Sequence, residues 1–210
     1  MGLATIWMPA PAEAIAASGL PATAPQERIL DTADVLSRAA IGELSKTLES
    51  FSAERVDAHL ITVNRLDYGL SLSQLGNSVL ERWSEAGGEP NQVLFLIDSQ
   101  TNSAAVVTSP GLDTQLDASL LRSTARTTMA QPIRDGGRYR QGSLDAMTRL
   151  LSVLQEGEDP GEPITAEVVS QPTNITTKEE TQSSNAFTWI VVLLTVGTIV
   201  PMLTWWVFSR

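Results

Sequence analysis

The sequence predicts an α/β layered domain with a mixed β-sheet flanked by helices, followed by one C-terminal transmembrane helix. Apolar runs of strand length alternate with segments whose apolar residues recur at helical spacing, which is the pattern of a layered α/β domain. The stretch from Phe187 to Phe208 contains no charged residue and, at about 22 residues, is long enough to cross a membrane. The 210 residues therefore accommodate one folded domain of ordinary size with appendages.

The first half of the domain predicts two strands and two helices. A short strand at Ile29-Leu30 and a nearly unbroken apolar run over 56–63 are the strands, and the second is typical of a central strand. Ser37 and Ser71 are the expected N-caps of the helices, and Gly87-Gly88 ends the second. Their apolar stripes are Ile41, Leu44, Leu48 and Phe51, then Leu72, Leu75, Val79 and Trp83.

The second half predicts a strand pair and two more helices. A short turn at 98–101 separates the apolar run 93–97 from the run 103–108, so we expect these strands to be antiparallel. The third helix carries Leu116, Leu120 and Met129 and is expected to end at Pro132. The fourth carries Leu144, Met147, Leu151 and Leu154.

The segments outside this domain predict an exported, membrane-tethered protein. Residues 1–16 combine a short apolar stretch with small-x-small triplets, which favours a signal peptide over a disordered Ala/Pro tail, although a positively charged start is missing. Residues 17–26 are then a flexible segment, 27–155 the α/β domain and 156–186 a flexible acidic linker. The span follows at 187–208, and the tail 209–210 carries Arg210, which favours a cytoplasmic position for that end.

Composition excludes several kinds of chemistry. The chain has no cysteine, so disulfides, thiolate nucleophiles and zinc fingers are excluded. A single histidine, His59, makes a histidine-based metal site or a Ser–His relay improbable, and its place in an apolar strand favours a structural role. The formal charge of −10 disfavours binding to nucleic acid.

Three aspartates are the only candidates for a metal or catalytic site. Asp31 and Asp34 follow the first strand and Asp98 ends another, and carboxylates at strand ends suit Ca²⁺ or Mg²⁺. The competing interpretation is that Asp31 and Asp34 cap the first helix while Asp98 forms an Asx turn. We favour capping.

Arginines concentrate in the last third of the domain. Between residues 118 and 150 six arginines face only two aspartates, and Lys46 is the domain's sole lysine. Arginine binds carboxylates and phosphates bidentately, so the stretch predicts a surface that docks an acidic protein or lipid head groups, unless it is a solvated helix face with local ion pairs. The candidate binding residues are Arg122, Arg126, Arg134, Arg138, Arg140 and Arg149.

Several short motifs occur in the order found in TPM-domain proteins. Ile29-Leu30-Asp31 with Asp34-Val35-Leu36-Ser37 resembles the family's opening segment, and Trp83 followed by Asn91–Leu96 resembles its W…(D)NGVLLL segment. The remaining matches are Thr108–Leu112, Pro132-Ile133-Arg134 and Tyr139–Gly142. Together they cover the domain from about residue 27 to residue 154.

With its signal, linker and span, the chain most resembles the branch of this family that assists photosystem II. The resemblance implies a single-pass protein of the thylakoid membrane with its domain in the lumen, where it binds photosystem II subunits or assembly intermediates during assembly, protection from photodamage or repair. A metal-assisted acid phosphatase is the alternative, with Asp31, Asp34 and Asp98 as its carboxylates. The sequence departs from the family at Pro90-Asn91-Gln92 and at Ser109, which removes a carboxylate and glycines, so we expect binding rather than catalysis. A membrane-anchored scaffold for another exported complex would keep the same architecture.

Overall fold

Four strands form one mixed sheet at the centre of the domain. The structure is a computed structural model that describes residues 19–161 and 186–208. The strands are β1 (Ile29–Asp31), β2 (Asp57–Val63), β3 (Gln92–Asp98) and β4 (Ser103–Thr108). They lie in the order β1-β2-β3-β4, with β1, β2 and β3 parallel and β4 antiparallel to β3. The mixed α/β architecture and the antiparallel last pair are confirmed.

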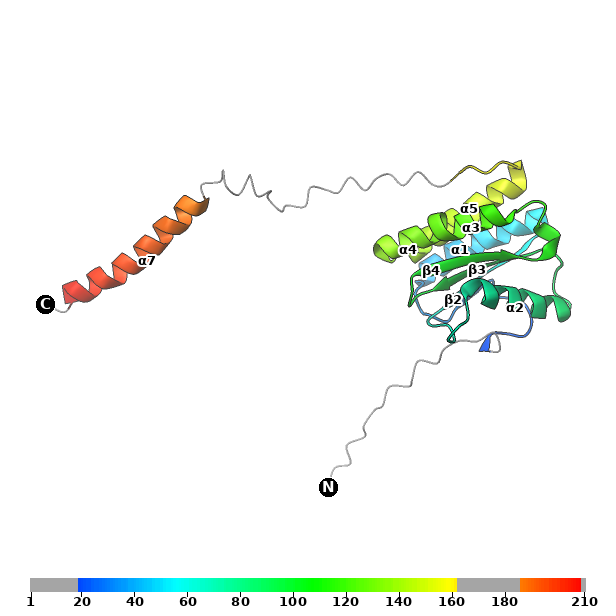
Figure 1. Cartoon of the computed structure of the whole chain (residues 1–210), viewed down its shortest axis with the longest axis horizontal. Coiled ribbons are helices and arrows are strands. Elements are labelled where there is room, and N and C mark those ends of the chain that lie inside the picture. Colours follow the sequence, from blue (N-terminus) through cyan, green and yellow to red (C-terminus); the bar gives the residue numbers. More distant parts are fainter. Residues whose placement is uncertain (1–18, 162–185, 209–210) are drawn as a thin grey trace, which may run out of the picture. The chain divides into compact units, whose positions relative to one another are not determined.

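Helices cover both faces of this sheet, as Figure 1 shows. On one face lie α1 (Arg38–Ser50), α3 (Ala118–Ser123), α4 (Ala130–Gly136) and α5 (Tyr139–Glu156), and α2 (Leu72–Glu85) lies on the other. Short 3₁₀ turns occur at η2 (Phe51–Glu54) and η3 (Pro110–Leu112), and the π-helical segment η4 (Thr124–Met129) joins α3 to α4. The result is three layers, with the sheet in the middle.

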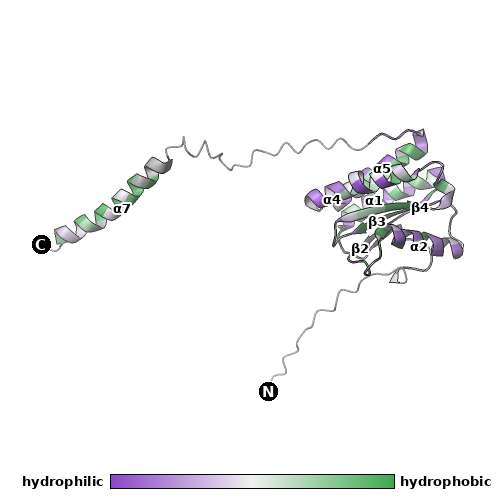
Figure 2. Cartoon of the chain, in the orientation of Figure 1, coloured by the Kyte–Doolittle hydropathy of each residue, from purple (hydrophilic) through white to green (hydrophobic). Residues whose placement is uncertain are grey.

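Each sheet face has its own apolar core. Towards α1 and α5, Leu44 and Met147 pack over Leu60 and Phe95, and all four are inaccessible to water. Towards α2, Trp83 is equally buried in a second cluster. Figure 2 shows the same pattern as apolar strands between helices whose outer sides are hydrophilic. Burial of apolar area at roughly 25 cal/mol per Å² is the main force that holds these layers together.

Both predicted serine caps are present. Ser37 Oγ accepts a hydrogen bond from the Ala40 amide at 3.2 Å, and so begins α1. Ser71 and Gln74 form a reciprocal capping box at the start of α2, in which each side chain bonds the other residue's backbone amide. Each cap satisfies amides that the first helical turn leaves without a partner.

The third predicted helix does not end at Pro132. Helical backbone continues through α3, η4 and α4 to Gly136, and Pro132 lies near the start of α4. A proline ring collides with the carbonyl four residues earlier in a regular α-helix and has no amide to donate. The wider π turn just before Pro132 relieves this conflict, so the proline changes the helix type where we expected a stop.

The domain extends beyond the predicted limits at both ends. Leu20, placed by the sequence in a flexible segment, is buried in the α2-side core, and Trp83 Nε1 donates to the Pro21 carbonyl at 3.0 Å. At the other end α5 runs to Glu156, and Asp159 beyond it is paired with Arg149. These contacts hold residues on both sides of 27–155 against the domain.

The C-terminal helix α7 (Ala186–Phe208) belongs to a second unit of the chain, separate from the domain. Within the residues that the structure describes, no helix is found that is long and apolar enough to cross a membrane. The span over 187–208 therefore stays a prediction. The expected signal at 1–16, the tail 209–210 and most of the linker 156–186 lie outside the described residues.

Candidate functional site

Three of the predicted arginines line one groove on the surface of the α3–η4–α4 helix. The groove has a volume of about 450 Å³ and is lined by Ser119, Arg122, Ser123, Arg126, Thr127 and Arg134. The three arginines are exposed. We call Arg122, Arg126 and Arg134 with this hollow the arginine groove.

The local fold explains why these side chains converge. The Asp117 side chain caps α3 by accepting from the Ser119 and Leu120 amides at 2.7 and 2.8 Å, which sets the start of the helix. Arg122 and Arg126 are four residues apart and so share one helix face. Arg134 turns back along the helix, and its Nη2 donates to the Arg126 carbonyl at 3.2 Å.

The electrostatics of the arginine groove favour an anion. Among the described residues, Arg122, Arg126 and Arg134 form no ion pair. The nearby hydroxyls already donate within the helix, Ser119 Oγ to Asp117 at 2.7 Å and Ser123 Oγ to the Leu120 carbonyl at 3.1 Å. The guanidinium groups are therefore the hydrogen-bond donors that this groove offers, and they match carboxylates or phosphates.

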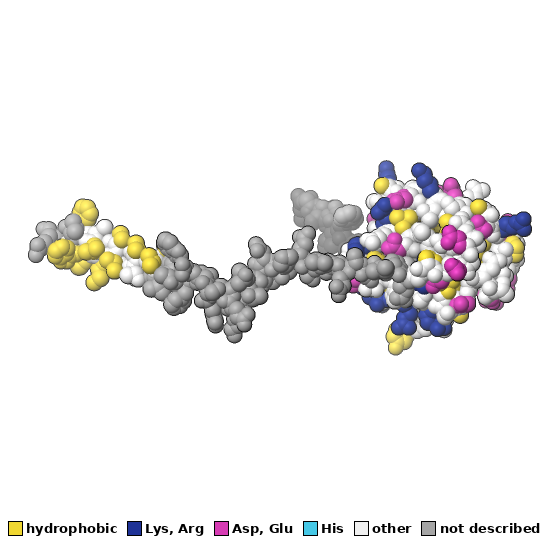
Figure 3. All heavy atoms as spheres, turned by 90° about the horizontal axis from the view of Figure 1, so that it is seen from above, with side chains coloured by type: hydrophobic (Ala, Val, Ile, Leu, Met, Phe, Trp, Pro, Cys, Tyr) yellow, Lys and Arg dark blue, Asp and Glu magenta, His cyan; other side chains and the backbone are white. Residues whose placement is uncertain are grey.

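The other predicted arginines do not join this groove. Arg140 forms a bidentate ion pair with Glu43 of α1, at 2.6 and 2.7 Å, and the hydrogen bonds from Arg140 lower the pKa of Glu43. Arg138 is exposed and its Nη1 donates to Gln141 at 3.4 Å. Figure 3 shows Lys and Arg side chains at several separate points around the margin of this face of the domain, with Asp and Glu side chains spread across it.

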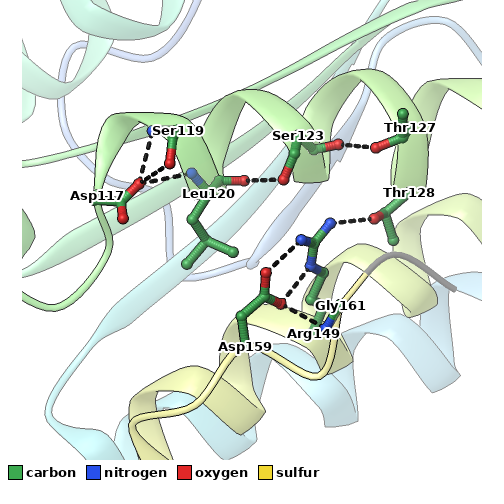
Figure 4. Close-up of polar contacts among 9 residues, drawn as sticks. All are labelled: Asp117, Ser119, Leu120, Ser123, Thr127, Thr128, Arg149, Asp159 and Gly161. Atoms are coloured by element: carbon green, nitrogen blue, oxygen red, sulfur yellow. Dashed lines mark hydrogen bonds and ion pairs between the residues drawn. The ribbon is translucent and has the colours of Figure 1, made fainter.

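Arg149 is buried and has a structural role. Its Nε and Nη2 donate to the two carboxylate oxygens of Asp159 at 2.7 and 2.6 Å, and its Nη1 donates to Thr128 of η4 at 2.9 Å (Figure 4). Only 5% of the Arg149 side chain is accessible, so it cannot contact a partner. The hydrogen bonds from Arg149 hold the pKa of Asp159 below its ordinary value. This contact, here called the arginine clasp, fastens the chain after α5 to the π-helical turn.

The three candidate aspartates are not brought together. Asp31 pairs with Thr62 in the sheet register, and Thr62 pairs with Ile97, so all three side chains leave the same face. Asp98 is the next residue after Ile97 and therefore points to the opposite face. Among the described residues, no group of three acidic or histidine side chains is placed to hold a metal ion.

Asp31 and Asp98 accept hydrogen bonds from groups close to them in the fold. Asp31 accepts from the Val35 and Leu36 amides at 3.3 and 2.9 Å and from the Thr62 hydroxyl. Asp98 accepts from the Gln100 amide at 2.9 Å in the turn before β4. Asp34 is exposed and has a left-handed backbone, with φ of 52°. Asp98 forms the expected Asx turn, but the expectation that Asp31 and Asp34 cap the first helix is wrong. Ser37 caps α1, Asp31 accepts from two amides that precede this helix, and within residues 19–161 the Asp34 side chain accepts no hydrogen bond.

His59 is buried beside α2. Its Nε2 lies 2.9 Å from Asp57 Oδ2, its ring meets Trp83 edge-on at 5.1 Å, and Asp57 also pairs with Arg28 at 2.7 Å. The hydrogen bond with His59, followed by that from Arg28, lowers the pKa of Asp57. These contacts place His59 in the packed interior and away from the arginine groove.

The unusual Ser109 has a clear structural role. Its hydroxyl donates to the Pro90 carbonyl at 2.7 Å and accepts from the Gln92 amide at 2.8 Å. Through these two hydrogen bonds the serine links the end of β4 to the start of β3. Sequence reasoning missed this link, and it also missed Ser119, Ser123 and Thr127, although their spacing of four residues places them on the face of Arg122 and Arg126.

The three layers define a small α/β domain with a basic groove on its surface, and comparison with known proteins identifies its family. The sequence model of the TPM domain matches residues 29–153, more than half of the chain. The protein therefore belongs to the TPM-domain family, as its motifs predicted.

Two solved structures match parts of this chain. The N-terminal domain of a P. gingivalis protein, solved by NMR, has a TM-score of 0.61 at 18% identity and covers 69% of this chain and 94% of that one. The N-terminal domain of the cg2496 protein from Corynebacterium glutamicum has a TM-score of 0.47 at 13% identity, with coverage of 65% and 83%. The comparison with curated proteins returns no match. At such identity the first structure supports the fold alone.

Proposed function

We propose that this protein is a membrane-anchored accessory protein that works by binding an acidic partner protein at the arginine groove. The observation that carries the proposal is the convergence of Arg122, Arg126 and Arg134 on one groove, without an ion pair among the described residues. Guanidinium groups bind carboxylates bidentately, and three of them near one another favour an acidic surface.

The proposed partners are photosystem II subunits or assembly intermediates, met by the domain on the lumenal side of the thylakoid membrane. Support comes from the TPM-domain membership and from the order of segments in the sequence, with a candidate signal before the domain and an apolar helix after it. The protein would then assist assembly, protection from photodamage or repair of that complex.

The proposed anchor is the helix α7. The sequence supports this role, because residues 187–208 form one continuous stretch without a charged side chain. An anchored domain stays close to membrane-protein partners, so its effective concentration near them rises.

The acid phosphatase is the weaker proposal. It needs Asp31, Asp34 and Asp98 to share a site, whereas the sheet register directs Asp31 and Asp98 to opposite faces. Asp31 and Asp98 also accept hydrogen bonds from nearby backbone amides. The observed geometry therefore favours binding over metal-assisted hydrolysis.

Affinity purification of tagged full-length protein from photosynthetic membranes tests the function. We expect photosystem II chains to co-purify with the wild type and to be lost with the double variant Arg122→Glu/Arg126→Glu. The matched control is Arg38→Glu/Arg65→Glu, which changes the charge equally at exposed positions elsewhere on the domain. Equal capture by both variants would contradict the arginine groove as the contact, and the absence of photosystem II chains from the wild-type sample would contradict the partner.

A further inference from the structure

Strand β4 leaves one edge of the sheet unpaired. It is the last strand in the order and pairs with β3 alone. The Ser109 amide donates to the Gln92 carbonyl at 2.9 Å, so this pair is a hydrogen-bonded pair of the antiparallel ladder. Because such pairs alternate, Ala105 and Val107 direct their backbone groups to β3, whereas Ala104, Val106 and Thr108 direct theirs outward. No backbone partner of these outward groups occurs in residues 19–161.

A groove follows this free edge. It has a volume of about 310 Å³ and is bounded by β4 residues 104–108. Its two walls are Ser73 and Asn77 from α2, and Leu121, Arg122, Ala125 and Arg126 from α3 and η4. Helices therefore flank the edge on both sides of the sheet, and between them Ala104 and Thr108 are partly exposed whereas Val106 is 6% accessible. Arg122 and Arg126 line this groove and the arginine groove alike.

The sequence of this edge lacks several of the features that usually prevent strand pairing. Natural edge strands are protected by lysine, proline, bulges or a covering segment. The β4 sequence SAAVVT contains no charged residue and no proline, and its register with β3 runs without a bulge over all six residues. A regular, uncharged strand edge beside two arginines is suited to binding another strand.

We propose that β4 binds an extended acidic segment of the partner protein as a fifth strand of the sheet. This inference rests on the proposed function, because the same Arg122 and Arg126 would bind the carboxylates. The outward backbone groups of β4 would form hydrogen bonds with the backbone of the bound segment, whatever its sequence. The groove walls on the two sides of the sheet would then select the side chains of that segment. The segment carries Glu or Asp at every second position, towards Arg122 and Arg126, and small polar residues towards Ser73 and Asn77.

Charge distinguishes this occupant from a second copy of the chain. Pairing of two β4 strands would bring Arg122 and Arg126 of both copies towards the same edge, and like charges placed there repel each other. An acidic strand instead gives each arginine a carboxylate to bind.

Hydrogen exchange tests the proposal on the full-length protein in detergent, with the capped peptide (Glu-Thr)₄ as probe. We expect the peptide to slow exchange at the Ala104, Val106 and Thr108 amides, while Ala105 and Val107 are already protected by β3. The peptide (Lys-Thr)₄, which has the same backbone pattern and opposite charge, should leave exchange unchanged. Unchanged exchange at Ala104, Val106 and Thr108 with the acidic peptide would overturn the proposal, as would protection that grows with protein concentration alone.

A pair of proline variants separates the backbone contact from the charge contact. Ala104→Pro removes one outward amide, and we expect roughly tenfold weaker binding of (Glu-Thr)₄ and of captured photosystem II chains. The control Ala118→Pro places a proline in the same groove at the first position of α3, where helices tolerate it, and should bind as the wild type does. If Arg122→Glu/Arg126→Glu abolishes partner capture while Ala104→Pro does not weaken it, strand addition is wrong and the proposed function stands. If neither variant weakens capture, both fail.

Discussion

At the scale of single residues, burial decides what each arginine can do. Only 5% of the Arg149 side chain is accessible, and its guanidinium donates hydrogen bonds to Asp159 and Thr128. Arg122 and Arg126, in contrast, are exposed in a groove. The first therefore fastens the fold and the others are free to bind. Periodicity could have shown this difference, because Gly142, Ala146, Arg149 and Val153 recur at helical spacing on the buried side of α5.

The arginine clasp predicts a measurable loss of stability. In Asp159→Asn the buried guanidinium keeps hydrogen-bond partners and loses its charge partner, so we expect the free energy of unfolding to fall by about 1–2 kcal/mol. The value stays modest because 38% of the Asp159 side chain is accessible and water screens the pair. Urea unfolding of the full-length protein measures the loss, with the exposed Asp113→Asn as control. An unchanged midpoint for Asp159→Asn would show that the clasp contributes nothing.

The same pair predicts a pH dependence. Arg149 lowers the pKa of Asp159 in the folded protein, so the clasp stabilises the fold fully above the ordinary aspartate pKa of about 3.9. This stabilisation is lost as the pH falls through the lowered pKa of the folded state. The difference in free energy of unfolding between the wild type and Asp159→Asn should therefore shrink in acid. A difference that stays constant below that range would contradict the assignment.

Asp31 supplies a second test at this scale. We expect Asp31→Asn to lower the free energy of unfolding by about 1 kcal/mol, because an amide oxygen accepts less strongly from the Val35 and Leu36 amides. Asp34→Asn is the control, since asparagine tolerates the left-handed backbone there and should change little. Unfolding in urea reports both. Hydrolysis of a chromogenic phosphate ester by the wild type that disappears in Asp31→Asn would instead support the phosphatase.

At the scale of elements, the π-helical turn η4 positions the arginine groove. It lies between α3 and α4, contains Arg126, and receives the close approach of α5 at Gly142. A Cβ on Gly142 would lie 2.4 Å from the Met129 carbonyl oxygen, so only glycine allows this contact. The position of the arginine groove therefore depends on how closely two helices pack.

Two glycines within helices give opposite predictions for alanine. Gly142→Ala forces α5 away from η4, and we expect a loss of about 1–3 kcal/mol in the free energy of unfolding. Gly42→Ala on the exposed side of α1 meets no atom within 4 Å and should stabilise the fold by up to about 1 kcal/mol. Urea unfolding of both variants decides the matter, and a Gly142→Ala protein as stable as the wild type would disprove the close approach.

Much of this element order could be predicted, because it depends on local patterns. The runs that became β2 and β3 are apolar on both faces, and Ser37 and Ser71 cap the helices that follow. The passage of the helix through Pro132 could not be predicted, since the relief comes from a change to π geometry. The burial of Leu20 could not be predicted either. It accompanies a hydrogen bond between the neighbouring Pro21 carbonyl and Trp83, which lies about sixty residues away in the sequence.

The candidate site was only partly predictable. The concentration of arginines is visible in composition, and helical spacing groups Arg122 with Arg126. The ion pair between Arg140 and Glu43 joins α5 to α1. It could not be predicted, because the two residues are far apart in the sequence and no local pattern indicates their contact. The same holds for the aspartates, because only the strand register shows that Asp31 and Asp98 leave opposite faces.

At the scale of the whole molecule, charge and hydropathy differ between segments of the chain, and so do the functions proposed for those segments. The chain carries a formal charge of −10, yet the helix that carries the arginine groove is locally basic. The apolar sequence of α7 would anchor the protein, and the intervening chain would let the domain meet partners near the bilayer. In this account the domain contributes a binding surface, and the membrane contributes proximity.

The most direct test is the equilibrium affinity between the purified full-length protein and its proposed partner, a photosystem II subcomplex, measured at two ionic strengths. We predict that Arg122→Glu/Arg126→Glu weakens the complex at least tenfold, roughly 1.4 kcal/mol, and that added salt weakens the wild-type complex more than the variant's. Arg38→Glu/Arg65→Glu should bind as the wild type does. Equal affinities for all three proteins, with no dependence on salt, would contradict a binding function at the arginine groove.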